Sequence, residues 1–566
     1  MAERESSHAV TRTPPKAGAV SELQRAIVNK YVSELGNKVG EETQITRRPS
    51  DEPAPLSFSQ QQVWLHAQMA GDIPFYNQTM TVYRQGTLDV DILERCLIEM
   101  IRRHEIWRTT FDVVGDEPVQ IVHPALQRFP WKVINLSALL EAEREREAVR
   151  MAATDVRRPF DLKTGPLLRA LLVSLDDEHH RLYMTFHHLI FDGVTAYSIF
   201  LPELEELYEA FSAGEPSPLP EPHLQYADFA YWQRKRLSAE IWSEDVAFWR
   251  KQLDGEFPPC QWPNDRPRPI METHRGAVER FVMPADLAKR IRASSQRAGV
   301  SVYVTLLAGL VALLHRYTSQ NDLVVGCLTS GRNRAELETM MGYFVNPVAL
   351  RIDLTGDPTF RELQDRVRKV VLEALEHQSV PFVQVVKEVQ PRHDPGRNPL
   401  FQIILSQQPQ LRHAVSGWDL VTDEVSNGGS ELDLLVVVDD RGSEIFGPIT
   451  YNTDVFDAST VQRMVGHWRT LLAAGCEYAE GRISELPLLT EVERQQILID
   501  WNETATSRSQ VPVHKVVEQQ AGKTATAVAV QCGDRQLTYA EPVSYTHLDV
   551  YKRQARWRIR ISTFSF

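Results

Sequence analysis

The chain has 566 residues and a net charge of −13, with 43% hydrophobic and 24% charged residues. These values are typical of a globular protein with ample core. The acidic balance excludes nucleic acid and anionic membrane as main partners. The N-terminus lacks the apolar segment of a signal peptide, and no stretch reaches the ~18 unbroken apolar residues of a membrane span. We therefore expect a cytoplasmic protein without membrane association.

The cysteines indicate neither a redox motif nor a zinc site. There are five, widely spaced and without a Cys-x-x-Cys pair. We expect reduced thiols in a reducing compartment. The five are Cys96, Cys260, Cys327, Cys476 and Cys532.

Residues 1–55 are predicted to be a disordered N-terminus, a short helix and a linker. Residues 1–19 are rich in Ser, Thr, Pro and charge, a composition typical of disorder. Ser21 is a candidate N-cap for a helix that ends at Gly36. This helix either packs on its own domain or docks onto an upstream protein. Its apolar face consists of Leu23, Ile27, Tyr31 and Leu35.

Residues 56–222 are predicted to form a first α/β lobe. Apolar residues recur at helical spacing over 88–103, and residues 160–175 lead through a strand. Leu182, Met184 and Phe186 then alternate with smaller or polar residues, as in a half-buried strand. The proline-rich stretch 213–222 is typical of an exposed crossover.

Residues 223–487 are predicted to form a second α/β lobe. Its clearest element is a helix over 301–317 with Ser301 as N-cap, followed by a strand at 323–326. Since helices and strands alternate in both lobes, the fold class is α/β.

The stretch His187-His188-Leu189-Ile190-Phe191-Asp192-Gly193, here called the His motif, lies where the predicted strand ends. Histidine takes and returns a proton near neutral pH because its ordinary pKa is about 6.5. A following glycine lets backbone N–H groups approach a reacting carbonyl. The combination suits acyl transfer.

Seven segments in family order resemble the condensation domains of nonribosomal peptide synthetases, relatives of chloramphenicol acetyltransferase. Two departures, Trp107 and Phe191, stand where leucine and serine are common, and they leave open a peptidyl, polyketide or fatty-acyl donor. Besides the His motif, the segments are Leu56-Ser57-Phe58-Ser59-Gln60-Gln61-Gln62-Val63-Trp64-Leu65, Arg103-His104-Glu105-Ile106-Trp107-Arg108-Thr109-Thr110-Phe111, Tyr226-Ala227-Asp228-Phe229-Ala230-Tyr231-Trp232, Met341-Gly342-Tyr343-Phe344-Val345-Asn346-Pro347, His377-Gln378-Ser379-Val380-Pro381-Phe382 and Arg397-Asn398-Pro399-Leu400-Phe401-Gln402.

The resemblance implies two chloramphenicol-acetyltransferase-like lobes that form a V-shaped pseudo-dimer. It also implies a reaction in which an acceptor amine attacks a donor thioester and an amide bond forms. Both substrates would be held on phosphopantetheine arms, one on an upstream donor carrier protein and one on a downstream acceptor carrier protein. The family binds no cofactor directly.

The resemblance assigns the chemistry to His188 and Gly193. His188 would accept the proton of the amine or position the amine; the alternative is a core histidine with satisfied hydrogen bonds. Gly193 would supply an N–H to the tetrahedral oxyanion, although a plain turn glycine fits equally well.

His187, Asp192 and Arg332 are expected to support the site. Neighbouring residues of a strand point to opposite faces, so His187 should face the lobe interior when His188 faces a channel. Asp192 could orient the imidazole as in a hydrolase triad. The resemblance favours instead an ion pair between Asp192 and Arg332, because a buried carboxylate needs a paired charge.

No metal is expected at the His motif. The spacing His-His-x-x-x-Asp offers three ligands, but the family uses no metal and the neighbourhood lacks acidic support for the ligands. A second histidine pair, His179-His180, follows three acidic residues and is expected in a solvated polar turn.

Other functions with this fold differ in recognisable ways. An epimerisation domain would not normally be followed by an adenylation domain, and a heterocyclising relative carries aspartates in place of both histidines. A non-catalytic module that recruits carriers or enzymes usually has a degraded His motif. A free-standing acyltransferase is disfavoured by the flanking segments.

Residues 488–541 resemble the start of an adenylation domain, carried by Leu488-Leu489-Thr490-Glu491, Trp501-Asn502 and Leu537-Thr538-Tyr539-Ala540-Glu541. The tract is too short for a nucleotide site, so the rest of the adenylation domain is missing. From Pro542 the resemblance stops, and residues 542–566 look like a non-native junction that we exclude from fold reasoning.

Overall fold

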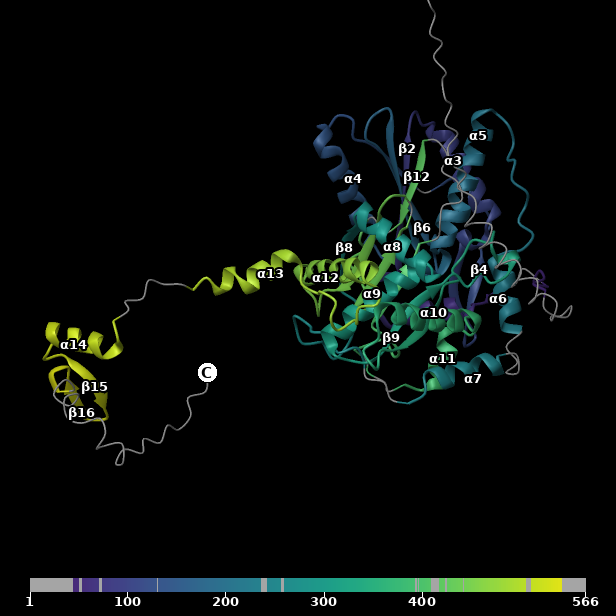
Figure 1. Ribbon diagram of the computed structural model, residues 1–566. Coiled ribbons are helices and arrows are strands. Elements are labelled where there is room, and N and C mark those ends of the chain that lie inside the picture. The colour runs from purple at the N-terminus through teal and green to yellow at the C-terminus, as the bar shows by residue number, and fades with distance from the viewer. Residues whose placement is uncertain are drawn as a thin grey trace, which may run out of the picture. The chain divides into compact units, whose positions relative to one another are not determined.

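A computed structural model describes residues 44–541 with short gaps (Figure 1). The helix predicted at residues 21–36 and the tail at 542–566 lie outside the described residues. The gaps are residues 50–52, 71–73, 130, 236–241, 256–258, 392–393, 395, 409–416, 423–424, 441 and 505–510. The chain divides into two compact units, residues 1–490 and 491–566.

The first lobe is built on a five-stranded sheet in the order β12-β2-β7-β6-β5. The edge strand β12 comes from late in the chain and pairs antiparallel with β2, Leu420 opposite Val82 (Figure 1). One strand of the range predicted as second lobe therefore belongs to the first sheet. The strands are β2 Asn77–Gln85, β5 Trp131–Asn135, β6 Leu168–Ser174, β7 His179–His187 and β12 Trp418–Thr422.

Helices and a small sheet cover this lobe. The predicted helix at 88–103 is confirmed as α3, which begins after Asp89, whose side chain accepts the N–H groups of Asp91 and Ile92. Helix α3 packs on α5. The elements are α2 Phe58–Ala70, α3 Val90–Arg103, α4 Glu141–Val156, α5 Leu201–Ser212 and α6 Tyr226–Lys235, with strands β1 Ala54–Pro55, β3 Thr109–Val114 and β4 Glu117–Val122.

The second lobe holds a six-stranded sheet in the order β10-β9-β11-β13-β14-β8. Strand β11 runs parallel to β9 and β13, and the other neighbours are antiparallel. The predicted strand at 323–326 is confirmed within β9. The strands are β8 Gly276–Met283, β9 Asp322–Thr329, β10 Asn346–Asp353, β11 Ile403–Gln407, β13 Leu434–Val438 and β14 Ile445–Asn452.

The core helix of the second lobe is α9, Val302–Thr318. It confirms the predicted helix, since the Ser301 hydroxyl accepts the N–H of Val304. Helix α9 packs against α8, α10 and α12. The remaining helices are α7 Ser243–Gln252, α8 Ala285–Ala298, α10 Phe360–Glu376, α11 Phe382–Val389 and α12 Ala458–Glu477. The α/β class with two sheet-based lobes is thereby confirmed.

The second unit contains helices α13 (Glu491–Leu498) and α14 (Val513–Lys523) and a hairpin of β15 (Val528–Cys532) with β16 (Arg535–Thr538). Across the described parts of both units, no single helix is long and apolar enough to cross a membrane. The bent pair α8 and α9 meets those two criteria together.

The structure corrects the prediction for the doublet His179-His180. Strand β7 begins at His179, which is exposed as expected, but His180 is buried and its Nδ1 lies 2.9 Å from the Ser174 hydroxyl. The strand alternation turns the second histidine inward, which composition alone does not show.

Candidate active site

Two cavities adjoin the His motif. One, of about 290 Å³, lies between the lobes and is lined by His188, Asp192 and Gly193 together with residues of β9, β11, β13 and β14. The other, of about 800 Å³, lies within the first lobe and is lined by His187. We call them the His188 cavity and the His187 cavity. Tyr76 and Asn77 line both and separate them.

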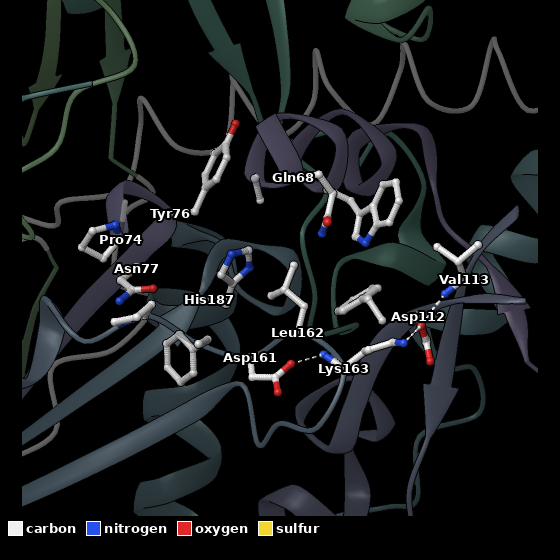
Figure 2. Close-up of a pocket in the computed structure, with 15 residues that line it drawn as sticks. Gln68, Pro74, Tyr76, Asn77, Asp112, Val113, Asp161, Leu162, Lys163 and His187 are labelled. Atoms are coloured by element: carbon white, nitrogen blue, oxygen red, sulfur yellow. Dashed lines mark hydrogen bonds and ion pairs between the residues drawn. The ribbon is translucent and has the colours of Figure 1, made fainter. Parts of the chain in front are cut away.

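The two histidines face different cavities because the backbone changes direction between them. His187 is the last residue of β7, and His188 opens a short 3₁₀ turn, His188–Ile190. Figure 2 shows the His187 ring turned into its cavity beside Tyr76 and Leu162. The expected opposite orientation of the two side chains is therefore present.

Hydrogen bonds place the ring protons of the two histidines differently. The Nδ1 atom of His188 lies 2.8 Å from the Phe191 carbonyl oxygen. A carbonyl only accepts, so His188 carries its proton on Nδ1 and keeps a lone pair on Nε2. His187 is the reverse, because its Nδ1 accepts the N–H of Leu189 at 3.2 Å. Of the two neutral rings, only His188 offers a free basic nitrogen at Nε2.

Burial keeps both rings neutral. It lowers the pKa of His188, and the nearby Phe191 carbonyl and Asp192 charge act in the opposite direction. Burial, with a contribution from His188, lowers the pKa of His187 to about 3. At neutral pH, His188 is therefore in the form that accepts a proton.

Asp192 pairs with Arg332. Two nitrogens of the guanidinium donate to the carboxylate, at 2.6 and 3.1 Å, and the two side chains are only 1% and 3% exposed. The carboxylate also accepts the N–H groups of Thr195 at 2.8 Å and Phe344 at 3.1 Å. The Nδ1–H of His188 goes to Phe191 instead, so the geometry is that of an ion pair rather than a relay.

The family segments hold one another beneath the site. Gln60 donates to the Leu189 carbonyl within the His motif at 3.1 Å. The Tyr226 hydroxyl lies 2.8 Å from that of Ser57 and donates to the Tyr343 carbonyl. The Tyr343 ring then packs against His188, with centroids 4.6 Å apart. Residues distant in sequence thus fix the position of His188.

The two departures from the family pattern meet at one ring. Phe191 stacks on Phe186 with centroids 4.3 Å apart and planes 3° from parallel. Trp107 packs on the same ring at 5.2 Å. Phe191 lines the His188 cavity, whereas Trp107 lies behind it and is 1% exposed. The departures therefore form one aromatic stack at the cavity wall.

Sequence reasoning missed Tyr76 and Glu431, which also line the His188 cavity. The two side chains are hydrogen-bonded to each other. Removal from bulk water raises the pKa of Glu431 to about 7, although the hydrogen bond from Tyr76 opposes the shift. Neither lies in a segment with a motif, and only the tertiary fold brings them together.

Gly342 allows the close approach that seats Tyr343 beside His188. Its φ is +148°, and an added Cβ would collide with the buried Tyr226 ring. We expect Gly342→Ala to cost about 1–3 kcal/mol through overpacking, measured as a lower free energy of unfolding. Gly356→Ala is the matched control, because Gly356 has φ +81° with nothing near an added Cβ. Equal losses in the two variants would contradict the packing argument.

A family model places the fold and site among known proteins. The condensation-domain model matches residues 50–498. The chain therefore belongs to the condensation-domain family, whose members are acyltransferases that form amide bonds. The family prediction from the sequence segments is confirmed.

The relatives are large synthetases. One of the linear gramicidin synthase proteins of Brevibacillus parabrevis is 38% identical over 500 residues, which is 87% of this chain and 6% of that protein. Chondramide synthase cmdD of Chondromyces crocatus is 38% identical over 85% of this chain and 12% of its own length. The chain thus spans a small part of these curated relatives.

Solved structures share the fold. The X-domain in a complex with OxyB from teicoplanin biosynthesis has a TM-score of 0.69 and 27% identity, covering 80% of this chain and 99% of that one. The first condensation domain of the calcium-dependent antibiotic synthetase has a TM-score of 0.67 and 21% identity, covering 77% and 100%. The second likeness shows the fold alone.

Proposed function

We propose that this chain transfers a carrier-bound acyl or peptidyl thioester to the amine of a carrier-bound aminoacyl acceptor. The donor is presented by an upstream carrier protein and the acceptor by a downstream one, both on phosphopantetheine. The observation that carries the proposal is the neutral His188, with its Nε2 lone pair in a cavity between two lobes. Incubation with one loaded donor carrier and one loaded acceptor carrier, followed by mass spectrometry of the acceptor arm, tests it.

In this proposal His188 takes the proton that the amine loses when it attacks the thioester carbonyl. The amine nitrogen forms the amide bond, the carbon–sulfur bond breaks, and the donor arm leaves as a thiol. Gly193, on the same cavity, supplies an N–H to the oxyanion. Asp192 and Arg332 hold the loop that carries both residues, and His187 supports the strand end.

The pH dependence of the reaction follows from the lowered pKa of His188. The base works when neutral, so its contribution should persist below pH 6.5 and fall only as the pH drops through the lowered value. The acceptor amine also titrates, so the measurement is the ratio of wild-type to His188→Ala rates across pH, in which that titration cancels. A ratio that rises on acidification would show that the imidazolium is the active form.

The proposed organisation has a first lobe at 56–222 joined by strand β12, a second lobe over the rest of 223–487, and an adenylation-domain start at 488–541. The family match ends at residue 498, near the proposed change of domain. A protease that cuts between the two compact units should leave condensation activity with the larger fragment.

A second candidate is a non-catalytic recruiting module. The likeness to an X-domain solved with OxyB favours it. The complete His motif, with the His188 lone pair facing the cavity, favours catalysis. Amide product from loaded carriers would exclude the recruiting module as the only function.

A further inference from the structure

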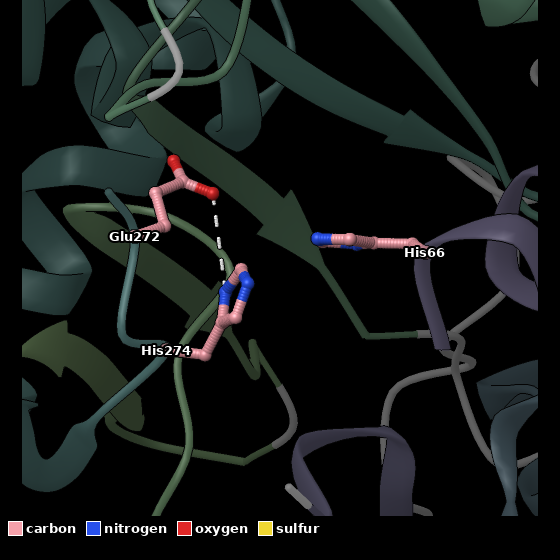
Figure 3. A group of neighbouring side chains, drawn as sticks. All are labelled: His66, Glu272 and His274. Atoms are coloured by element: carbon pink, nitrogen blue, oxygen red, sulfur yellow. Dashed lines mark ion pairs between the residues drawn. The ribbon is translucent and has the colours of Figure 1, made fainter. Parts of the chain in front are cut away.

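Outside the His motif, two histidines and a glutamate converge at a junction between the lobes (Figure 3). His66 lies on helix α2 of the first lobe. Glu272 and His274 lie on the segment that leads into β8 of the second lobe. One possible ligand atom of each side chain lies within 4.8 Å of those of the others, and among the described residues this is the group of three that could hold a metal ion.

We propose that His66, Glu272 and His274 bind a zinc-class divalent transition-metal ion that ties helix α2 to the segment entering β8. Two imidazoles and one carboxylate are the donors of three-ligand zinc sites, whereas calcium and magnesium prefer oxygen alone. The fourth position would be taken by water or by a substrate group.

His274 supplies an independent observation. Its side chain is 8% exposed, and its buried Nδ1 atom has no hydrogen-bond partner. That atom faces the Glu272 carboxylate at 3.9 Å, too far for a hydrogen bond. The ring stacks on Phe75 with centroids 4.7 Å apart, which fixes its plane. An orphaned nitrogen aimed into the cluster is what a bound cation would satisfy.

The partners of His66 prepare it as a ligand. Its Nδ1 lies 2.7 Å from the Tyr76 hydroxyl, which is in turn hydrogen-bonded to Glu431. When Tyr76 donates to the Glu431 carboxylate, its oxygen accepts the Nδ1–H of His66, so Nε2 keeps the lone pair. A ligating histidine held through its other nitrogen is the usual arrangement around zinc.

The local charges also favour a cation. Burial, Asp433 and Glu431 raise the pKa of Glu272 to about 7, against the pull of Arg268. That guanidinium is occupied, because it donates to both oxygens of Asp433. Tetrahedral bonds of about 2.0–2.2 Å put ligand atoms roughly 3.3–3.5 Å apart, so the three groups need to close by about 1 Å.

The test is titration of the untagged full chain with Co²⁺ and Zn²⁺. We expect one ion per chain, visible d–d bands typical of four-coordinate Co²⁺ with nitrogen and oxygen ligands, and a higher melting temperature with Zn²⁺. His66→Gln, Glu272→Gln and His274→Asn should each weaken binding by about 10-fold or more. Asparagine is chosen at 274 because it tolerates the φ of +55° found there.

The matched control is His179→Gln, an exposed histidine 2.9 Å from the Asp176 carboxylate and outside the cluster. It should bind the ion as wild type does. Absence of a Co²⁺ spectrum, or equal affinity in the three cluster variants and the control, would overturn the proposal. So would a thiolate charge-transfer band that disappears in Cys260→Ser. Glu272→Gln, at a side chain 24% exposed, keeps the test valid if a histidine variant does not fold.

Discussion

Replacement of His188 by alanine is expected to lower condensation between loaded donor and acceptor carriers by on the order of 10²-fold or more. The Nε2 lone pair faces the cavity between the lobes, and the other nitrogen is held by Phe191. The measurement is the single-turnover rate of amide formation at saturating carriers. Melting curves should show a folded protein, because the side chain is only partly buried and borders a cavity.

The matched control for this prediction is His179→Ala, an exposed histidine at the start of the same strand. It should condense at the wild-type rate. A His188→Ala rate within a few-fold of wild type would remove His188 from any essential role. The recruiting-module function would then become the better account of the fold.

Breaking the pair of Asp192 and Arg332 is expected to have the largest effect on stability. Removing one partner leaves the other charge buried, which costs about 3–5 kcal/mol. Asp192→Ala and Arg332→Ala should each lower the free energy of unfolding by that order, and the double variant should lose less than their sum. Activity should fall as well, since the loop beside His188 loses its anchor.

The control for this series is Arg150→Ala, which breaks an exposed pair with Glu147 on α4. Such pairs contribute little, so its melting curve should match wild type. The hydrolase-like alternative makes a different forecast, in which Asp192→Asn loses rate with unchanged melting. Additive losses from Asp192→Ala and Arg332→Ala would also contradict the buried pair.

Local sequence determined the secondary elements and the chemistry-bearing residues. Helix 301–317 was predictable because its apolar spacing and Ser301 cap act within a few residues of each other. The strand leading to the His motif was equally clear from its alternation. These features depend on periods of 3.6 and 2.0 residues along the chain, which are visible without knowing the fold.

Family resemblance extended the prediction to long-range contacts. The pair of Asp192 and Arg332 joins residues 140 apart, and no spacing rule links them. Their partnership was implied by ordered segments, not by local pattern. The same holds for the two lobes, whose confirmed α/β architecture depends on many such segments together.

Only the tertiary structure decided the proton positions on His187 and His188, because these depend on which backbone group each nitrogen meets. It also placed β12 in the first sheet and the departures Trp107 and Phe191 on one ring. The Tyr76–Glu431 contact and the cluster of His66, Glu272 and His274 arise where the two lobes touch. Contacts between distant segments are set by how whole lobes pack, and a single sequence carries no local period or cap that reports them.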